Sequence, residues 1–314
     1  MNKPNVMIVS IPGMIEPKDW KKLEEKANVA YFEKNILTIS ELLDLIKTAE
    51  YLMLNYDVIE NLPEEFYKEI KARNYPLKGI STDITGMTWA HPEFAHQYGI
   101  TLMNTPNYST VSVAEFAFTS LLLHAKKLNF ICNEIRENNE LKPLKNDVLF
   151  NKTLGIIGLG AIGSRMAELA LGFGMNVIGW NRTNKSVQGV EMKSLKDVFT
   201  ESDYVSLHLK TTPETGNIVN KKMLDLTKKK PIIVNQADGA LVNNDDMLDA
   251  IQSGKVAGYS TVIKAIKDHA LLNNPNVTAF PAQAWFTDHS LDLLKKIWVE
   301  NIFHAIDGEM QNVI

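Results

Sequence analysis

The chain has 314 residues, a length typical of two domains rather than one. Hydrophobic residues make up 45% and charged residues 22%, so the chain can bury a core, and its net charge of −4 does not suggest a nucleic-acid surface. A single cysteine, Cys132, excludes an internal disulfide and a cysteine-rich metal site, and no apolar stretch is long enough for a membrane span.

In chain order, the first hundred or so residues alternate between strand-like and helical patterns. The runs NVMIVSI, NVAYFE, YLMLNY, LKGIST and ITLMNT are apolar and strand-like, and amphipathic helical segments separate them. Strands that alternate with helices predict a parallel sheet that is covered on both faces. The N-terminal stretch has too short an apolar run for a signal peptide, so a cytoplasmic protein is expected.

Residues 110–128 break this alternation with one long and very apolar helical run. Its polar face is narrow, so the helix is expected to be buried between domains or subunits. Residues 129–150 are more polar and resemble a connecting arm. A second alternating series runs from 153 to about 281, and a last amphipathic helix is predicted over 290–306.

The strongest motif is the G-x-G-x-x-G of Gly158, Gly160 and Gly163, which follows an apolar strand and opens a helix. The first glycine permits a tight turn, and the third permits close packing of helix and strand. At the second, backbone N–H groups, including those of Ala161 and Ile162, approach a pyrophosphate. The motif predicts a dinucleotide site. The alternative is a tight turn without a ligand.

The residues after the next strand, NVIGW, should select the cofactor. An acid there would bind the ribose 2′-hydroxyl of NAD, but this chain has Asn181, Arg182 and Thr183. Nothing in this set repels a 2′-phosphate, and Arg182 could grip one with paired N–H donors. The sequence therefore favours NADP(H), with NAD(H) possible. The alternative is that Arg182 is a solvated surface arginine.

Several stretches together resemble the D-isomer-specific 2-hydroxyacid dehydrogenase family, and in particular its glyoxylate/hydroxypyruvate reductase members. They are TGMTWAHPEFAHQYGITLMNTPNYSTVSVAEFAF, SDYVSLHLKTTPETGNIVN and HALLNNPNVTAFPAQAW. The resemblance implies two Rossmann-like, doubly wound α/β domains, one flavodoxin-like and one dinucleotide-binding. The substrate-type domain would be discontinuous, 1–103 plus 285–314, and the dinucleotide domain would be 104–284. A homodimer through the 110–128 helix is also implied, as are cofactor contacts at Leu209, Lys210, Thr215 and Ala237.

At the catalytic positions the sequence departs from the family pattern. The arginine that binds the substrate carboxylate corresponds to Asp238, and the catalytic histidine corresponds to Ala282, beside Gln283. Aligned without gaps, the orienting glutamate falls on Lys267 and the nicotinamide-facing aspartate on Val262. A 2-keto acid needs a cation and an acid–base group, so the ordinary family reaction is not expected.

Other residues could replace the lost groups. His91 in the substrate-loop segment TGMTWAH is the best candidate for an acid–base role, whereas His289 and His208 fit surface and structural roles better. Asp238 is expected beside the nicotinamide, paired either with Lys267 or Lys264, or with a cationic ligand. No cluster of His, Asp and Glu has ligand spacing, so no metal is expected.

Three functional hypotheses remain open from the sequence. The first is an NADP(H)-dependent oxidoreductase of altered mechanism, acting on an amine, an imine or another cationic small molecule, with Asp238, Lys267 and His91 as candidate catalytic residues. The second is a dinucleotide-binding sensor, scaffold or partner subunit without catalysis. The third is a 2-hydroxyacid reductase that uses rerouted groups such as His91. No nucleic-acid or membrane partner is expected.

Overall fold

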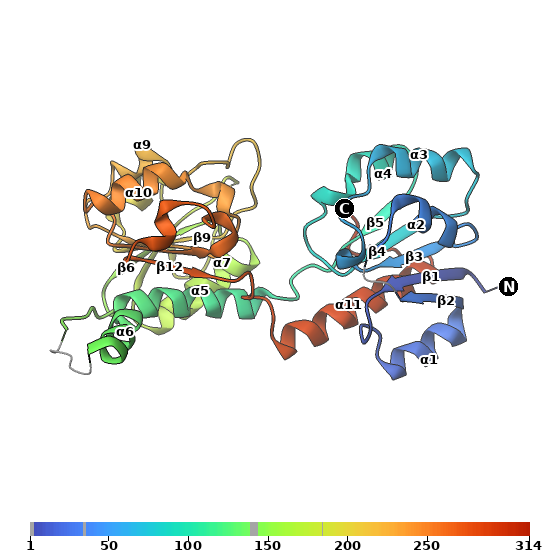
Figure 1. The fold of residues 1–314 in the computed structure, drawn as a ribbon, viewed down its shortest axis with the longest axis horizontal. Coiled ribbons are helices and arrows are strands. Elements are labelled where there is room, and N and C mark those ends of the chain that lie inside the picture. The colour runs from blue at the N-terminus through green and yellow to red at the C-terminus, as the bar shows by residue number, and fades with distance from the viewer. Residues whose placement is uncertain (1–2, 34–35, 139–143, 184) are drawn as a thin grey trace. The chain divides into compact units, whose positions relative to one another are not determined.

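The structure is a computed structural model that describes residues 3–33, 36–138, 144–183 and 185–314. The chain divides into two compact units, Met1–Tyr108 with Asp288–Ile314, and Ser109–Thr287. Each unit contains one parallel sheet with helices on both faces, which confirms the predicted pair of α/β domains (Figure 1). The borders of the units lie a few residues from those expected.

The first unit has a five-stranded sheet in the order β2-β1-β3-β4-β5, with every neighbouring pair parallel. Its strands are β1 Asn5–Ser10, β2 Asn28–Glu33, β3 Tyr51–Leu54, β4 Gly79–Thr82 and β5 Thr101–Met103. Its helices are α1 Pro17–Lys26, α2 Ile39–Leu45, α3 Glu64–Ala72, α4 Pro92–Gln97 and α11 Asp288–Ile306. The inner strands β3 and β4 are buried throughout, as expected for a sheet that is covered on both sides.

The last helix, α11, belongs to the first unit because its side chains are locked to that unit's sheet. Trp298 is fully buried, and its indole N–H donates to the carbonyl oxygen of Ser81 at 2.9 Å. The Asn301 side chain donates to the carbonyl oxygen of Asn104 at 2.9 Å. Figure 1 shows α11 and α1 on one face of this sheet and α2, α3 and α4 on the other. A chain segment from beyond the second unit thus completes the core of the first.

The second unit has a seven-stranded parallel sheet in the order β12-β11-β10-β9-β6-β7-β8. Its strands are β6 Thr153–Ile157, β7 Asn176–Trp180, β8 Val190–Met192, β9 Tyr204–Leu207, β10 Ile232–Asn235, β11 Gly258–Val262 and β12 Val277–Phe280. The strand order reverses between β6 and β9. In sheets of this kind, ligands bind outside the carboxyl ends of the strands at such a switch point.

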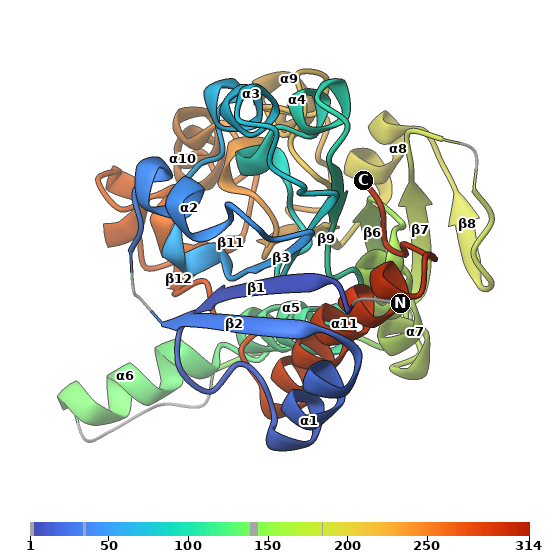
Figure 2. The ribbon, with the colours of Figure 1, turned by 90° about the vertical axis from the view of Figure 1, so that its right-hand side faces the viewer.

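Helices cover both faces of the second sheet. They are α5 Thr110–Ala125, α6 Leu128–Asn138, α7 Ala161–Gly172, α8 Leu195–Glu201, α9 Lys221–Leu224 and α10 Asn244–Gln252. Figure 1 shows α5 and α7 on one face and α9 and α10 on the other, and Figure 2 shows β8 at the edge of the sheet beyond β7. The core under α5 includes Phe118, Leu121 and Met166.

The long helix ends earlier than the sequence pattern predicts. Helix α5 stops at Ala125, and Lys127 adopts a left-handed backbone conformation with φ 53°. A second helix, α6, then occupies part of the segment that resembled a connecting arm. The sequence pattern did not predict this break because the apolar run continues through Leu128. Hydrophobicity alone does not indicate that one residue adopts a left-handed backbone conformation. Residues 139–143 of that segment lie outside the described residues.

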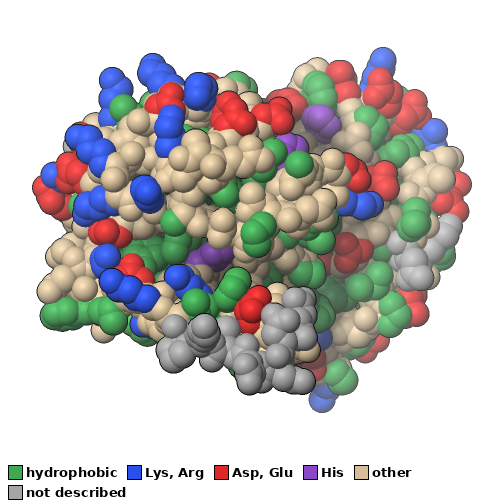
Figure 3. All heavy atoms as spheres, turned by 60° about the vertical axis from the view of Figure 1, so that its left-hand side comes forward, with side chains coloured by type: hydrophobic (Ala, Val, Ile, Leu, Met, Phe, Trp, Pro, Cys, Tyr) green, Lys and Arg blue, Asp and Glu red, His purple; other side chains and the backbone are tan. Residues whose placement is uncertain are grey.

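The outer surface carries mixed charge. On the face shown in Figure 3, basic and acidic side chains are interspersed with apolar ones. None of the helices in the described ranges is long and apolar enough to cross a bilayer. Within the same ranges, no group of three or more His, Cys, Asp and Glu side chains is arranged to hold a metal ion. Cys132 is exposed and free.

Candidate functional site

The glycine motif forms a tight turn between β6 and α7. Gly158 has φ 98°, and a Cβ built on it would lie 2.5 Å from the carbonyl oxygen of His208. A Cβ on Gly163 would lie 1.9 Å from the carbonyl oxygen of Gly158. Both positions therefore require glycine. Gly158 has a positive φ and lies against the residues that follow β9, and Gly163 allows the helix to approach the turn closely.

The N-terminus of α7 is open to a ligand. Gly160 is the N-cap of this twelve-residue helix, has no side chain that could cap it, and leaves open space where a Cβ would stand. Ala161 is exposed and Ile162 partly so. The first N–H groups of a helix lack partners within the helix and attract anions. The turn and the helix start therefore fit a dinucleotide pyrophosphate.

The loop after β7 folds back onto this turn. The side-chain oxygen of Asn181 accepts the Leu159 N–H at 3.2 Å, and its amide group donates to the Thr183 hydroxyl at 3.0 Å. Arg182 and Thr183 are exposed. No hydrogen bond or ion pair joins the Arg182 side chain to another described residue, although its charge helps to lower the pKa of the Glu214 carboxyl, after the hydrogen bond from Thr212.

The loop after β9 lies against the same turn. Thr215 is buried, and its hydroxyl donates to the carbonyl oxygen of Lys210 at 2.8 Å, which fixes the loop. Leu209 is partly buried, and the Lys210 side chain is exposed. Desolvation lowers the pKa of His208 to about 4, so its ring is neutral at pH 7, and a 2.9 Å hydrogen bond joins it to Ser206. The structure thus gives His208 a local structural partner.

At the end of β10, Asp238 is exposed. One carboxylate oxygen accepts the Ala240 N–H at 3.0 Å and so caps the short 3₁₀ turn Gly239–Leu241. The buried Asn235 holds the backbone here, accepting from the Ala237 N–H at 3.1 Å and donating to the Asp238 carbonyl oxygen at 2.9 Å. The Asp238 carboxylate is therefore fixed in direction by its own turn.

Asp238 lines a hollow of about 470 Å³ at the ends of β10 and β11. The lining residues are Ala237, Asp238, Gly239, Ala240, Val242, Asn244, Val262, Lys264 and Ala265. Within the described ranges, no ion pair joins Asp238 to Lys264 or to Lys267, and both lysines are exposed. Of the two partners expected for Asp238, a lysine or a cationic ligand, the described residues show no lysine contact, and one carboxylate oxygen accepts the Ala240 N–H.

The position at which the sequence resemblance predicts the family histidine follows β12. Ala282 is exposed, and its carbonyl oxygen accepts the Trp285 indole N–H at 3.1 Å. Gln283 beside it is also exposed. Neither a methyl group nor a neutral amide can serve as a general acid or base.

The two candidate histidines of the first unit have local roles. A hydrogen bond of 3.1 Å joins His91 Nε2 to the side-chain oxygen of Asn61, and Nδ1 lies 3.3 Å from a carboxylate oxygen of Glu93. Both ring nitrogens therefore face acceptors. His289 lines a charged groove between α1 and α11, together with Lys18 and Asp292. It fits the surface role that its sequence position suggested.

The sequence did not predict the contacts of two charged residues, Lys185 and Asp83. Lys185 donates to the carbonyl oxygen of Leu159 in the glycine turn, and the stretch NRTNK hinted at it only as a second cation after Arg182. Asp83, after β4, is buried and accepts the Tyr56 N–H at 2.7 Å. Burial raises the pKa of the Asp83 carboxyl to about 6. No local pattern marks a carboxylate as buried.

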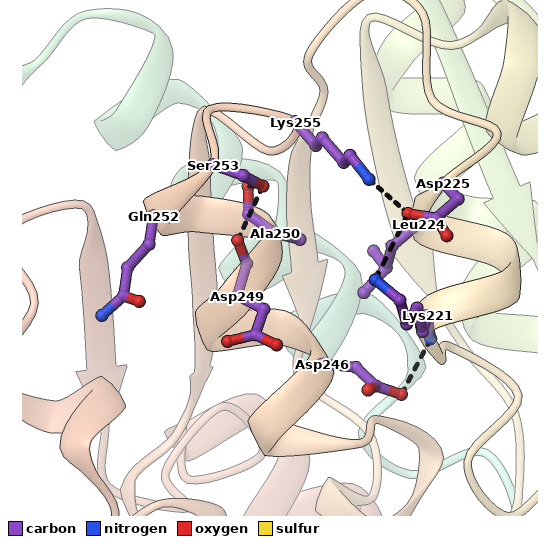
Figure 4. Close-up of a pocket in the computed structure, with 9 residues that line it drawn as sticks. All are labelled: Lys221, Leu224, Asp225, Asp246, Asp249, Ala250, Gln252, Ser253 and Lys255. Atoms are coloured by element: carbon purple, nitrogen blue, oxygen red, sulfur yellow. Dashed lines mark hydrogen bonds and ion pairs between the residues drawn. The ribbon is translucent and has the colours of Figure 1, made fainter.

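A second hollow of about 470 Å³ lies between α9 and α10 (Figure 4). Its charges largely pair with one another. Lys255 bonds to Asp225, the Lys221 ammonium lies 3.8 Å from Asp225, and the Lys221 backbone N–H donates to Asp246 at 2.8 Å. This hollow resembles a solvated helix interface and shares no lining residue with the one at Asp238.

Comparison with known proteins agrees with this geometry. Residues 118–284 match the family model described as D-isomer specific 2-hydroxyacid dehydrogenase, NAD binding domain. A D-lactate dehydrogenase of Streptococcus agalactiae is 33% identical over 255 residues, which cover 74% of this chain and 77% of the relative. A D-3-phosphoglycerate dehydrogenase of Methanocaldococcus jannaschii is 30% identical over 288 residues, which cover 88% of this chain. The match spans 54%, about half, of that relative's length.

Among solved structures, an acyclic imino acid reductase, Bsp5, in complex with NADPH and D-Arg superposes with a TM-score of 0.86. It is 23% identical and covers 99% of both chains, so it shows the same fold. The glycine turn, the helix start and the matched family model lead to one conclusion. The chain belongs to the D-isomer-specific 2-hydroxyacid dehydrogenases, a family of NAD-binding oxidoreductases.

Proposed function

We propose that this protein is an NADP(H)-dependent oxidoreductase whose substrate carries an imine or another cationic group in place of a 2-keto carboxylate. The observation that carries the proposal is Asp238. A carboxylate stands where the family has an arginine, and it has no cationic partner among the described side chains. A carboxylate in a site of this kind attracts a cation and repels a keto acid.

The cofactor would be held by residues that already have a suitable geometry. The N–H groups of Ala161, Ile162 and Gly163 would bind the pyrophosphate at the start of α7. Arg182 and Thr183 would meet a ribose 2′-phosphate. When bound, the reduced nicotinamide supplies a hydride.

An imine explains why the loss of the family histidine can be tolerated. Hydride transfer to a ketone creates an alkoxide, which needs a proton from a general acid, and Ala282 cannot give one. A protonated imine already carries its proton on nitrogen. Hydride transfer to its carbon breaks the C=N π bond and leaves a neutral amine, so no protein acid is required in that step.

The charge of the substrate would match the charge of the site. The protonated imine is a cation, and Asp238 would bind it through the carboxylate oxygen that does not cap the turn. Lys264 lines the same hollow and would repel a substrate that carries more than one positive charge. Lys267 is exposed and is proposed only as a secondary contact.

The fold itself is compatible with this chemistry. Bsp5, which has the same fold, is described as an imino acid reductase in complex with NADPH and D-Arg. At 23% identity the likeness concerns the fold alone, so the proposal depends on Asp238 and Ala282 in this chain.

The experiment is to follow NADPH absorbance while the protein is supplied with imines formed from simple amines and aldehydes. We expect turnover with imines and none above background with glyoxylate, hydroxypyruvate or pyruvate. Asp238→Asn keeps the turn cap, because an amide oxygen also accepts the Ala240 N–H, and should raise KM for the imine about fivefold, as for one exposed charge pair. If the protein reduced keto acids and did not reduce imines, the proposal would be overturned.

A dinucleotide-binding protein without catalysis is the second candidate. It is favoured because Ala282 offers no proton and both nitrogens of His91 already face acceptors. The same contacts weigh against a 2-hydroxyacid reductase rerouted through His91. Tight NADPH binding by calorimetry, combined with no turnover of any imine or keto acid, would select this candidate.

We also propose a homodimer that packs through α5, as the sequence resemblance implies. Helix α6, which directly follows α5, carries exposed apolar side chains that would extend this interface: Leu128, Phe130 and Ile135 are about half exposed, at 48%, 48% and 50%. Sedimentation velocity would show one species of twice the chain mass. A single species of the chain mass at micromolar concentration would contradict it.

A further inference from the structure

Asp238 and Lys264 hold equivalent places at the ends of two neighbouring strands. Strands β10 and β11 are parallel, and Asn235 pairs with Thr261 in their register. Asp238 and Lys264 each lie three residues beyond that pair, and both line the hollow of about 470 Å³ at the strand ends. Because neighbouring strands lie about 4.8 Å apart, the acid and the base follow adjacent ends of the sheet.

The two turns that carry these residues are packed tightly against each other. Gly239 follows Asp238 and begins one 3₁₀ turn, and Ala265 follows Lys264 and ends another. A Cβ built on Gly239 would lie 2.3 Å from the Cβ of Ala265, so only glycine allows this approach. The Asn244 side chain also donates to the carbonyl oxygen of Ala265 at 2.8 Å. The backbone positions of the acid and the base are therefore fixed relative to each other.

The two charged side chains nevertheless do not pair. Among the described residues, neither Asp238 nor Lys264 forms an ion pair, and both are exposed. The hollow of equal volume between α9 and α10 differs in this respect (Figure 4). There, Lys255 bonds to Asp225, and Lys221 lies 3.8 Å from the same carboxylate. The hollow at the strand ends thus keeps one charge of each sign available to a ligand.

A ligand of this hollow gains most if it carries both charges. A cation alone would meet the Asp238 carboxylate but would lie near the ammonium of Lys264, which repels it. An anion alone would meet the reverse situation. Each exposed ion pair contributes up to about fivefold in affinity, so a molecule with both charges would gain from two pairs and avoid both repulsions.

We propose that the hollow binds a zwitterion, with its nitrogen cation at the Asp238 carboxylate and its carboxylate at the Lys264 ammonium. The substrate class is then an imine that also carries a carboxylate, and the product is an amine that carries one. This inference rests on the proposed function, because the role of Asp238 as the cation site belongs to it. What it adds is Lys264 as the residue that selects the anionic end of the substrate.

The test is a ligand-observed NMR titration of the native protein with matched probes, so no turnover enters the measurement. β-Alanine carries both charges. Isopentylamine has an isopropyl group in place of that carboxylate, and butyrate has a methyl group in place of that ammonium. We expect β-alanine to bind about fivefold more tightly than either of the singly charged probes.

Variants assign each charge to its residue. Lys264→Met should remove the advantage of β-alanine and leave isopentylamine unchanged or up to about twofold tighter, because methionine neither binds the carboxylate nor repels the cation. Asp238→Asn should weaken both amines and spare butyrate. Lys222→Met, an equal charge change on the exposed face of α9, should alter none of the affinities.

The outcomes separate this inference from the function on which it rests. If β-alanine and isopentylamine bind equally, or if Lys264→Met keeps the advantage of β-alanine, the zwitterion site is refuted and the cation site at Asp238 stands. If neither amine binds, the cation site fails and this inference fails with it. If β-alanine binds through Lys264 but no imine consumes NADPH, the zwitterion site stands and the proposed catalysis fails.

Discussion

The glycine turn after β6 and the strand ends after β10 and β12 belong to one sheet, but they fit the family pattern to different degrees. At the turn, Gly158 and Gly163 are each required by a contact that no other residue allows. At the strand ends, the sequence resemblance assigns Asp238 and Ala282 to the family's arginine and histidine positions, and both residues are exposed. We therefore expect cofactor binding and proton chemistry to be separable properties of this scaffold.

The largest expected effect comes from damage to the turn. In Gly163→Ala the new Cβ would lie 1.9 Å from the Gly158 carbonyl oxygen, so the helix or the turn must move. We expect a loss of about 3 kcal/mol or more in the free energy of unfolding, as for overpacked cores. Urea denaturation measures the loss, and calorimetry should detect no NADPH binding.

The matched control lies in the same helix. A Cβ on Gly172, at the end of α7, would meet nothing within 4 Å. Gly172→Ala should therefore leave stability unchanged, or raise it by up to about 1 kcal/mol. If Gly163→Ala were as stable as Gly172→Ala, close packing would not require glycine at position 163.

The next largest effect comes from repairing the strand ends. The double substitution Asp238→Arg and Ala282→His would supply a carboxylate-binding cation and an acid–base group at the positions that the sequence resemblance assigns to them. Since one general acid–base group contributes about 100-fold or more, hydroxypyruvate reduction should rise at least about 100-fold above the native background. A stopped assay of NADPH consumption measures it.

The native protein provides the reference for that comparison. A native turnover number for hydroxypyruvate within the ordinary enzyme range of about 1 to 1,000 per second would mean that other groups already perform this chemistry. The strand ends would then differ from the family pattern in their residues, and the protein would still catalyse the family reaction.

A pH-dependent effect should follow from His208, which lies beside the turn. Desolvation lowers its folded pKa to about 4 from 6.5, so between these values the unfolded chain binds the proton and the folded chain does not. The contribution of His208 is complete above about pH 6.5 and is lost as the pH falls toward 4. Asparagine does not titrate, so in His208→Asn this part of the pH dependence of the free energy of unfolding should disappear, as denaturation at each pH would measure. Equal pH profiles of the native protein and His208→Asn would refute a lowered pKa of this ring.

The smallest of these effects concerns cofactor choice. Arg182 is exposed, so Arg182→Ala should weaken NADPH only about tenfold and leave NADH almost unchanged. Calorimetry with both cofactors gives the ratio. A loss of NADH affinity of the same size would show that Arg182 supports the loop and does not select the phosphate.

Local pattern was sufficient to predict the turn and the two sheets. G-x-G-x-x-G between a strand and a helix is a short-range signal, and alternation of strands with helices reports burial on both faces. The break between α5 and α6 was missed, since an apolar run continues through Leu128 while the backbone changes hand at Lys127. The hydrophobic pattern of the sequence does not predict the positive φ of Lys127.

Side-chain environments were harder to predict, because they depend on which segments meet. For Asp238 the sequence left open a lysine or a cationic ligand as the partner, and it did not predict that one carboxylate oxygen caps the turn that follows. The contact of Lys185 with Leu159 joins residues from different loops, and the burial of Asp83 depends on the loop after β3. Such contacts follow from strand order, which sequence spacing does not specify.

The placement of α11 has a consequence for the order in which a ribosome releases this chain. Trp298 and Ile302 fill the face of the first sheet that carries Val6, Ile8 and Met53, yet they are synthesised after the whole second unit. The second unit can fold as a continuous segment while the first still lacks one wall of its core. Domains generally fold in the order of synthesis, but here the domain that starts first is expected to finish last.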